Sequence, residues 1–291
     1  MSTSPQVAVL GCGLMGAAIA RTFSQHVGVV VWNRTPAKAE ALASDTVAVA
    51  ASGAEAIAAA PVVVSVLSDY DALREVLAEV DSLEGRTVVG LSTSEPGDSR
   101  DLEALVVGMG GAYLDGGILA YPVHIGTPGC VIAYGGDAAT WAATRDLLML
   151  LGGGSLHVSE DVGGSGVVDA GLAGLFALPM HLALVEAVSY MARNGIAPES
   201  ISTQLRRSLE DTSATLEEMV AGILATDHST DQATVAVYAD AAYAWRDSVL
   251  ATGDRASMLA AAAVTLREAE AAGLGDLGFT GLARLAPAAA G

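Results

Sequence analysis

The stretch QVAVLGCGLMGAAIARTF, residues 6–23, constrains the fold most strongly. An apolar run over 6–10 leads into three glycines with the spacing G-x-G-x-x-G (Gly11, Gly13 and Gly16), and an alanine-rich helical pattern follows. The first glycine permits a tight turn, the second lets a pyrophosphate approach the backbone, and the third lets helix and strand pack closely. Because a second apolar run follows over 27–35, the order of elements predicts a dinucleotide-binding unit.

The start of the first helix and the end of the second strand indicate which dinucleotide binds. Leu14 and Met15 open the helix, where free N–H groups attract a pyrophosphate. NAD-binding proteins usually carry an acidic residue after the second strand. Here the sequence reads Asn33-Arg34-Thr35, followed by Lys38, the only lysine in a chain of net charge −19. Arg34 and Lys38 would attract a 2′-phosphate, with hydrogen bonds from Asn33 and Thr35, so we expect NADPH. The alternative is a solvated basic loop.

The remainder of the first half continues the same pattern. Apolar runs end near residues 68 and 93 in Ser or Thr, and in open α/β sheets the ligand lies at such carboxyl ends. Further strands are expected within 111–122 and 130–137, and a helix over 138–152. The fold class is therefore α/β, with a doubly wound parallel sheet of the Rossmann type over residues 1–160. The residues expected on the nicotinamide side are Leu67, Ser68, Ser92 and Thr93.

Composition excludes several other classes of protein. The negative charge argues against binding to nucleic acid or to anionic membranes. Residues 47–67 are long and apolar enough to span a bilayer, but Pro61 divides them into a helix near 52–60 and a buried strand. Cys12 and Cys130 form no disulfide framework, and the chain starts without a signal-peptide pattern, so we expect a cytoplasmic protein. The histidines are dispersed, and no metal site is expected.

The second half, residues 161–291, is predicted to be entirely helical. A long helix over about 167–194 ends near Gly195 and should be kinked at Pro179. Because it is apolar on nearly all sides, it must be covered either by the rest of the chain or by a second subunit. Three more helices are expected within 198–224, 231–253 and 256–275.

Asp169 is the acidic residue within the small, apolar stretch GGSGVVDAGLAG, residues 163–174. An aspartate near the start of a helix is often structural, since it favours the helix dipole and caps free N–H groups. However, Ser165 or Gly166 could begin this helix, and few polar side chains in this half could react beside a nicotinamide. We therefore single out Asp169 as the candidate catalytic residue.

Several of these motifs carry a family resemblance that runs almost from end to end. They are VAVLGCGLMGAAIA, VVWNRTPAKAEAL, VLSDYDALREVL, LDGGILAYPVHIGTPGCVIAYGG, VVDAGLAGLF and AAGLGDLGFTGL. The chain resembles the imine reductases, a branch of the β-hydroxyacid dehydrogenase superfamily with a 6-phosphogluconate dehydrogenase-like fold. The resemblance implies an NADPH-dependent oxidoreductase that reduces C=N bonds to chiral amines. It also implies a homodimer in which the long helix over 167–194 links the two domains. Each active site would then combine one subunit's cofactor domain with the other's helices.

The resemblance also assigns roles to residues of the second half. The related dehydrogenases place a catalytic lysine where this chain has Asp169, and Lys38 is already assigned to the cofactor. Asp169 could protonate the imine nitrogen or act as counter-ion to an iminium. Relatives that condense ketone and amine tend to carry a tyrosine where this chain has Ala177, and often an asparagine at Thr93, so we expect preformed, cyclic imines. The residues expected to hold the substrate are Leu172, Leu175, Phe176 and Met180, with Val237 and Tyr238 from the partner subunit.

Two other functions remain open from the sequence. A β-hydroxyacid or alcohol dehydrogenase would need an acid/base group in place of the missing lysine. A protein that binds NADPH as a sensor would need no reacting group at all.

Overall fold

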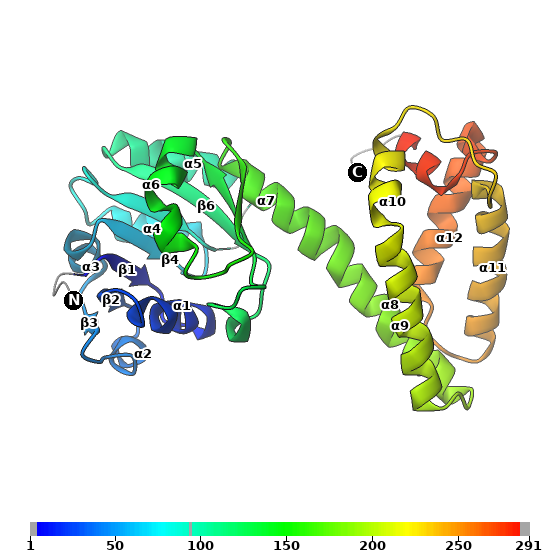
Figure 1. Cartoon of the computed structure of the whole chain (residues 1–291), viewed down its shortest axis with the longest axis horizontal. Helices are drawn as coiled ribbons and strands as arrows, with labels where there is room; N and C mark the ends of the chain where they lie inside the picture. The colour runs from blue at the N-terminus through cyan, green and yellow to red at the C-terminus, as the bar shows by residue number, and fades with distance from the viewer. Residues whose placement is uncertain (1–4, 93–94, 286–291) are drawn as a thin grey trace. The chain divides into compact units, whose positions relative to one another are not determined.

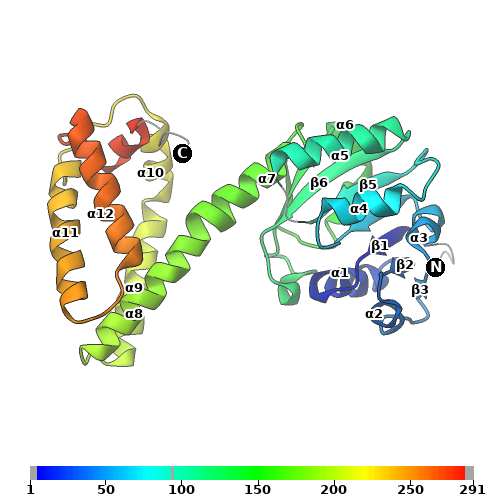
Figure 2. The same cartoon turned by 180° about the vertical axis from the view of Figure 1, so that it is seen from behind.

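The computed structural model describes residues 5–92 and 95–285, and its contacts divide the chain into two compact units. The first unit is Met1–Phe176 and the second is Ala177–Gly291. Figure 1 shows the first unit as a sheet with helices on its faces and the second as a group of helices, and Figure 2 shows both from behind. The units are described one after the other.

An eight-stranded sheet forms the centre of the first unit, in the order β3-β2-β1-β4-β5-β6-β7-β8. All neighbouring strands are parallel except β6 and β7. The predicted fold class is confirmed, but the sheet is not parallel throughout. The β6–β7 connection, residues 119–131, contains a short 3₁₀ turn (Pro122–His124), whereas the crossover between parallel strands is usually an α-helix. The strands are β1 (Val7–Leu10), β2 (Val29–Trp32), β3 (Val47–Val49), β4 (Val62–Ser65), β5 (Thr87–Gly90), β6 (Ala112–Ile118), β7 (Ile132–Gly136) and β8 (Leu156–Ser159).

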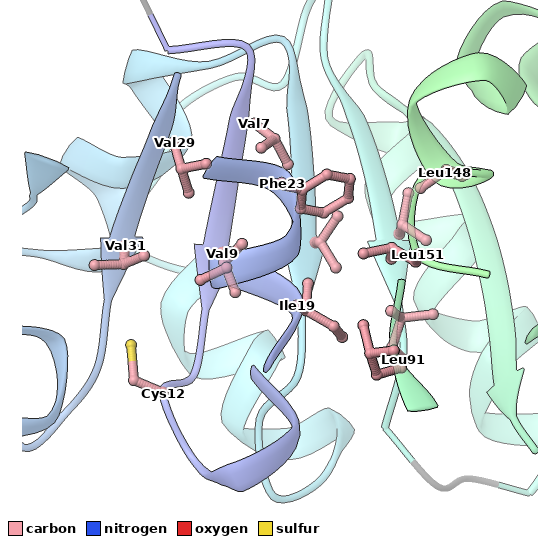
Figure 3. Packing of buried hydrophobic residues seen from close by; sticks show 14 of the residues in the cluster. Val7, Val9, Cys12, Ile19, Phe23, Val29, Val31, Leu91, Leu148 and Leu151 are labelled. Carbon is pink, nitrogen blue, oxygen red and sulfur yellow. The ribbon is translucent and has the colours of Figure 1, made fainter. Parts of the chain in front are cut away.

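Helices cover both faces of the sheet, so its central strands are apolar without alternation. Val7 and Val9 of β1 point to one face, where they join Ile19 and Phe23 in the core shown in Figure 3, whereas Ala8 points to the opposite face. This two-residue period is that of a strand. The helices of the unit are α1 (Leu14–Ser24), α2 (Pro36–Glu40), α3 (Gly53–Ala59), α4 (Tyr70–Leu77), α5 (Pro96–Gly108), α6 (Ala138–Leu148) and α7 (Gly163–Asp169).

The segment 47–67 contains short elements of this unit. Its residues form β3, α3 and β4, with Pro61 directly before β4. The sequence prediction of a helix followed by a buried strand is therefore confirmed, since Val63 and Val64 are fully buried. The prediction missed β3, whose three residues are too few to show a period.

A helical stretch runs from Gly163 to Arg193 and crosses the boundary between the units. It begins at Gly163 rather than at 167, because the Asp161 carboxylate accepts a hydrogen bond from the Gly163 N–H at 3.0 Å. A π-helical segment (Ala170–Ala177) separates α7 from α8 (Leu178–Arg193), and Pro179 lies directly after it. Because proline lacks an N–H and its ring crowds the preceding turn, this is where the winding departs from α-helical.

The second unit consists of helices, as predicted. Its core packs α11 against α12 through Val235, Ala239 and Leu266. The segment 198–224 forms two helices rather than one, and the first ends before Thr215, whose φ of −102° and ψ of 3° depart from helical values. Besides α8, the helices are α9 (Pro198–Ala214), α10 (Leu216–Leu224), α11 (Val235–Ala251), α12 (Ser257–Ala269), a π-helical turn (Glu270–Leu274) and a 3₁₀ segment (Phe279–Arg284).

Candidate functional site

The glycine loop after β1 lies where the strand order of the sheet reverses, between β1 and β4. Ligands of open α/β sheets bind in the crevice at such a point. Gly11 has a φ of +100°, and a Cβ there would lie 2.4 Å from the Val66 carbonyl oxygen that follows β4. A Cβ on Gly16 would lie 1.9 Å from the Gly11 carbonyl oxygen. Both positions therefore require glycine for the loop to close against β4 and α1.

Gly13 differs from these two glycines. Apart from atoms of Gly13 and its two chain neighbours, no described atom lies within 4 Å of the position that its Cβ would take. Gly13 is also the residue before α1, and among the described side chains none caps the first turn of that helix. The loop thus combines open space with free N–H groups at a helix N-terminus, which fits the pyrophosphate of a dinucleotide.

A cavity of 360 Å³ extends from the glycine loop to the end of β2 and contains the predicted 2′-phosphate residues. The side chains of Arg34 and Lys38 are exposed there and free to meet an anion. Asn33 is already engaged, since its Oδ1 accepts from the Cys12 N–H at 2.9 Å and its Nδ2 donates to the Thr35 carbonyl at 3.0 Å. Asn33 therefore joins the glycine loop to the basic loop, and it keeps one amide hydrogen for a ligand.

A second cavity of 360 Å³ opens on the other side of the glycine loop. The predicted residues Leu67, Ser68 and Ser92 line it, and Thr93 lies outside the described residues. The Ser92 hydroxyl donates to the Leu67 carbonyl at 2.9 Å, which links the loops after β4 and β5. The two cavities share Gly13, Val66, Leu67 and Ser68, so they form one continuous cleft along the carboxyl ends of the strands.

Asp169 lines this second cavity together with Gly13 and Ser68. It is the last residue of α7 and is half-buried. Burial raises the pKa of its carboxyl group. Since the side chain forms no hydrogen bond with any other described residue, its carboxyl oxygens remain available to a ligand. The structure thus brings Asp169 into the same cavity as the glycine loop.

The close packing of Asp169 against the sheet depends on β6, a strand that the sequence analysis did not connect with the site. A Cβ on Gly117 would lie 3.2 Å from the Asp169 Cβ and 3.1 Å from the Ser165 carbonyl oxygen. Asp115 also lines the cavity, although it is only 2% exposed. The signal available in the sequence was a carboxylate within the apolar run AYLDGGI, because a buried charge needs partners that a strand alone does not supply.

The predicted substrate residues lie outside these cavities. Leu172, Leu175 and Phe176 follow Asp169 on the helical stretch, with exposed fractions of 50%, 82% and 58%. Met180 belongs to α8, whereas Val237 and Tyr238 belong to α11 in the second unit. Tyr238 packs edge-on against the Phe279 ring with centroids 5.2 Å apart. Over residues 5–92 and 95–285, no three His, Cys, Asp or Glu side chains are grouped so as to hold a metal ion.

The chain is similar to several known proteins over much of its length. An NADPH-dependent reductive aminase from Aspergillus oryzae is 29% identical over 191 residues, which span 63% of this chain and 65% of that enzyme. An imine reductase variant from Myxococcus stipitatus, solved with NAD⁺, has a TM-score of 0.90 at 26% identity and covers 98% of this chain and 99% of its own. A reductive aminase from Aspergillus terreus, solved with NADPH and ethyl-5-oxohexanoate, has a TM-score of 0.87 at 28% identity, over 96% of this chain and 98% of its own.

The match to a family agrees with the position of the cleft. Residues 6–160 match the NAD binding domain of 6-phosphogluconate dehydrogenase, and this range includes both the glycine loop and the basic loop after β2. The chain therefore belongs to the family defined by that NAD-binding domain.

Proposed function

We propose that the protein is an NADPH-dependent oxidoreductase that reduces the C=N bond of preformed, cyclic imines to chiral amines. One observation carries the proposal: a half-buried carboxyl group with a raised pKa, Asp169, lines the cavity beside the glycine loop. Lys38, the only lysine of the chain, lines the opposite end of the cleft. An alcohol dehydrogenase that relies on a catalytic lysine is therefore disfavoured.

The cleft fits NADPH along its length. The open space at Gly13 and the uncapped start of α1 suit the pyrophosphate, and Arg34 and Lys38 suit the 2′-phosphate. When bound, NADPH supplies a hydride. Residues 1–160 then form the cofactor domain, and residues 161–291 supply the dimer contacts and part of the substrate site.

Asp169 has one of two roles in the proposed reaction. A protonated iminium accepts a hydride far more readily than a neutral imine does. Because burial raises the pKa of Asp169, its protonated form persists at higher pH and can donate to the imine nitrogen. For a substrate that arrives already charged, the carboxylate form would instead stabilise the iminium.

An absorbance assay tests the proposed reaction. NADPH consumption is followed through the loss of absorbance of the reduced nicotinamide, with 2-methyl-1-pyrroline and, separately, with a β-keto acid. We expect consumption with the imine only, because the site lacks the lysine of the related dehydrogenases. Consumption with the keto acid only would support the dehydrogenase. A change in cofactor fluorescence without consumption would support a sensor that binds NADPH but does not turn it over.

We further propose that the active form is a homodimer with shared active sites. The helical stretch 163–193 is long and apolar enough to cross a membrane, with a mean hydropathy of 1.7. No residue in its most apolar part is buried within the described chain. Leu175, Leu178 and Val185 on it are 82%, 59% and 64% exposed. A second copy would cover this surface, as the resemblance to imine reductases implies. Free Cys12 and Cys130 support a cytoplasmic location.

Complementation between two variants tests the shared site. Asp169→Asn damages the site in one subunit, and Tyr238→Ala damages the contribution that its partner makes. A mixed dimer of the two contains one intact site, so about half of the wild-type turnover per dimer should return. Co-expression with two affinity tags isolates the mixed dimer. Turnover no higher than that of the single variants would contradict the shared site, and a monomeric mass in solution would contradict the dimer.

A further inference from the structure

Asp115, in β6, is a buried carboxylate with a dense set of hydroxyl partners. It accepts hydrogen bonds from the hydroxyls of Tyr113, at 2.9 Å, and of Tyr70 and Ser165. Ser99 donates a fourth. Burial raises the pKa of Asp115, and the hydroxyl donors oppose this effect. A carboxylate that is only 2% exposed would be costly without such donors.

The cluster joins four elements of the first unit. Tyr70 begins α4, Ser99 lies in α5, Tyr113 lies in β6, and Ser165 lies in α7. The neighbouring strand leaves room for it, since a Cβ on Gly90 of β5 would lie 2.3 Å from the Tyr113 hydroxyl oxygen. Asp115 therefore ties α7, the helix that carries Asp169, to the sheet.

The two carboxylate oxygens of Asp115 serve different elements. Oδ1 accepts from Tyr113 and Tyr70, whereas Oδ2 accepts from Ser165. Ser165 precedes Asp169 by one helical turn, so the two side chains lie on the same face of α7. The Asp115–Ser165 hydrogen bond thus acts on the face of α7 that carries Asp169.

A second contact between the same elements lies beside the first. Gly117 shares a face of β6 with Asp115, because alternate residues of a strand point the same way. The absence of a Cβ on Gly117 lets Asp169 approach, as the 3.2 Å distance from that position to the Asp169 Cβ shows. Asp115 against Ser165 and Gly117 against Asp169 together define the register of α7 on β6.

We propose that Asp115 is a positioning residue that acts through Ser165 to hold the Asp169 carboxyl group at the cavity. The inference rests on the proposed role of Asp169 in the reaction. Asp115 holds the helix, and Asp169 acts on the substrate. A shift of about 1 Å in a reacting group can lower a rate by about 100-fold, so a single hydrogen bond that sets a helix register has a measurable effect.

A matched pair of variants separates positioning from general stability. Ser165→Ala removes the hydrogen bond that joins Asp115 to α7. Tyr113→Phe removes a hydrogen bond to the same carboxylate, but its donor lies in β6 and not in α7. We expect Ser165→Ala to lower kcat for 2-methyl-1-pyrroline by about 10-fold without a change in the Kd of NADPH. Tyr113→Phe should keep kcat within about twofold of the wild type, even where both variants unfold at a lower temperature. Hydrogen exchange should increase in residues 163–176 with Ser165→Ala only.

The combination with Asp169→Asn provides the decisive measurement. If Ser165 acts through Asp169, Ser165→Ala should cause no further loss of single-turnover rate in the Asp169→Asn background. Gly117→Ala adds a methyl group of β6 close to the Asp169 Cβ, so it should likewise cause no further loss of rate in the Asp169→Asn background. Independent losses that multiply, equal effects of Ser165→Ala and Tyr113→Phe, or a wild-type rate in Ser165→Ala would each overturn the positioning role. Wild-type turnover in Asp169→Asn would instead overturn the proposed role of Asp169.

Discussion

Replacing Asp169 with Asn is expected to lower kcat for 2-methyl-1-pyrroline by about 10²–10⁴-fold, the range that a positioned proton donor contributes. Asn has nearly the same shape but cannot donate a carboxyl proton or carry a negative charge. The Kd of NADPH and the unfolding temperature should remain close to those of the wild type, because the Asp169 side chain forms no hydrogen bond with the described part of the chain. Asp169→Leu, which places an apolar side chain at the cavity, should be equally inactive. Turnover like that of the wild type in either variant would remove Asp169 from the mechanism.

A permanently charged substrate distinguishes the two roles of Asp169. The 1,2-dimethyl-1-pyrrolinium ion has no nitrogen lone pair and needs no proton before it accepts a hydride. If Asp169 donates a proton, Asp169→Asn should retain turnover of this ion while losing that of 2-methyl-1-pyrroline. If Asp169 is a counter-ion, both substrates should lose turnover.

The pH dependence of kcat gives an independent answer. Burial raises the pKa of Asp169, so the acid form is lost only as pH rises through that raised value. A proton donor then predicts a kcat that falls with rising pH, whereas a counter-ion predicts one that falls as pH drops through the same value. In either case this limb should be absent from the profile of Asp169→Asn.

The double substitution of Arg34 and Lys38 with Ala should raise the KM for NADPH by about 100-fold, with little change in the KM for NADH. Each side chain offers the 2′-phosphate a charge-assisted hydrogen bond. The loss of about 1.4 kcal/mol of binding free energy per bond weakens binding tenfold, so two lost bonds weaken it about 100-fold. Both side chains are exposed at the cavity beside the glycine loop, where they are screened by salt. Added salt should therefore weaken NADPH binding by the wild type more than by the variant.

Arg21→Ala is the matched control for this substitution. Arg21 is exposed in the last turn of α1, away from the residues that line the cleft, so its removal changes the net charge without touching the expected 2′-phosphate site. The KM for NADPH should remain within about twofold in this variant. An equal rise of KM for both cofactors in Arg34→Ala/Lys38→Ala would contradict the assignment of NADPH.

The elements of the first half could be predicted because their signals are local. The apolar run before Gly11 and the helical pattern after Gly16 are each determined by neighbouring residues, and the division at Pro61 is equally local. The antiparallel pairing of β6 with β7 was missed, since the direction of a strand depends on the path of the 119–131 connection. The break at Thr215 was also missed, because helical periodicity continues through it.

The order of residues along the chain already places Asp169 as an acidic residue in an apolar helix of a chain with one lysine, and it places glycines before a helix where a dinucleotide can bind. It takes the folded chain to show that these features line one cavity, and that Asp115 and Gly117 contact α7 from β6. The physical reason is separation along the chain. Asp115 and Ser165 are joined by a hydrogen bond although their positions in the sequence differ by 50, and no local pattern encodes a contact made only when β6 and α7 pack together.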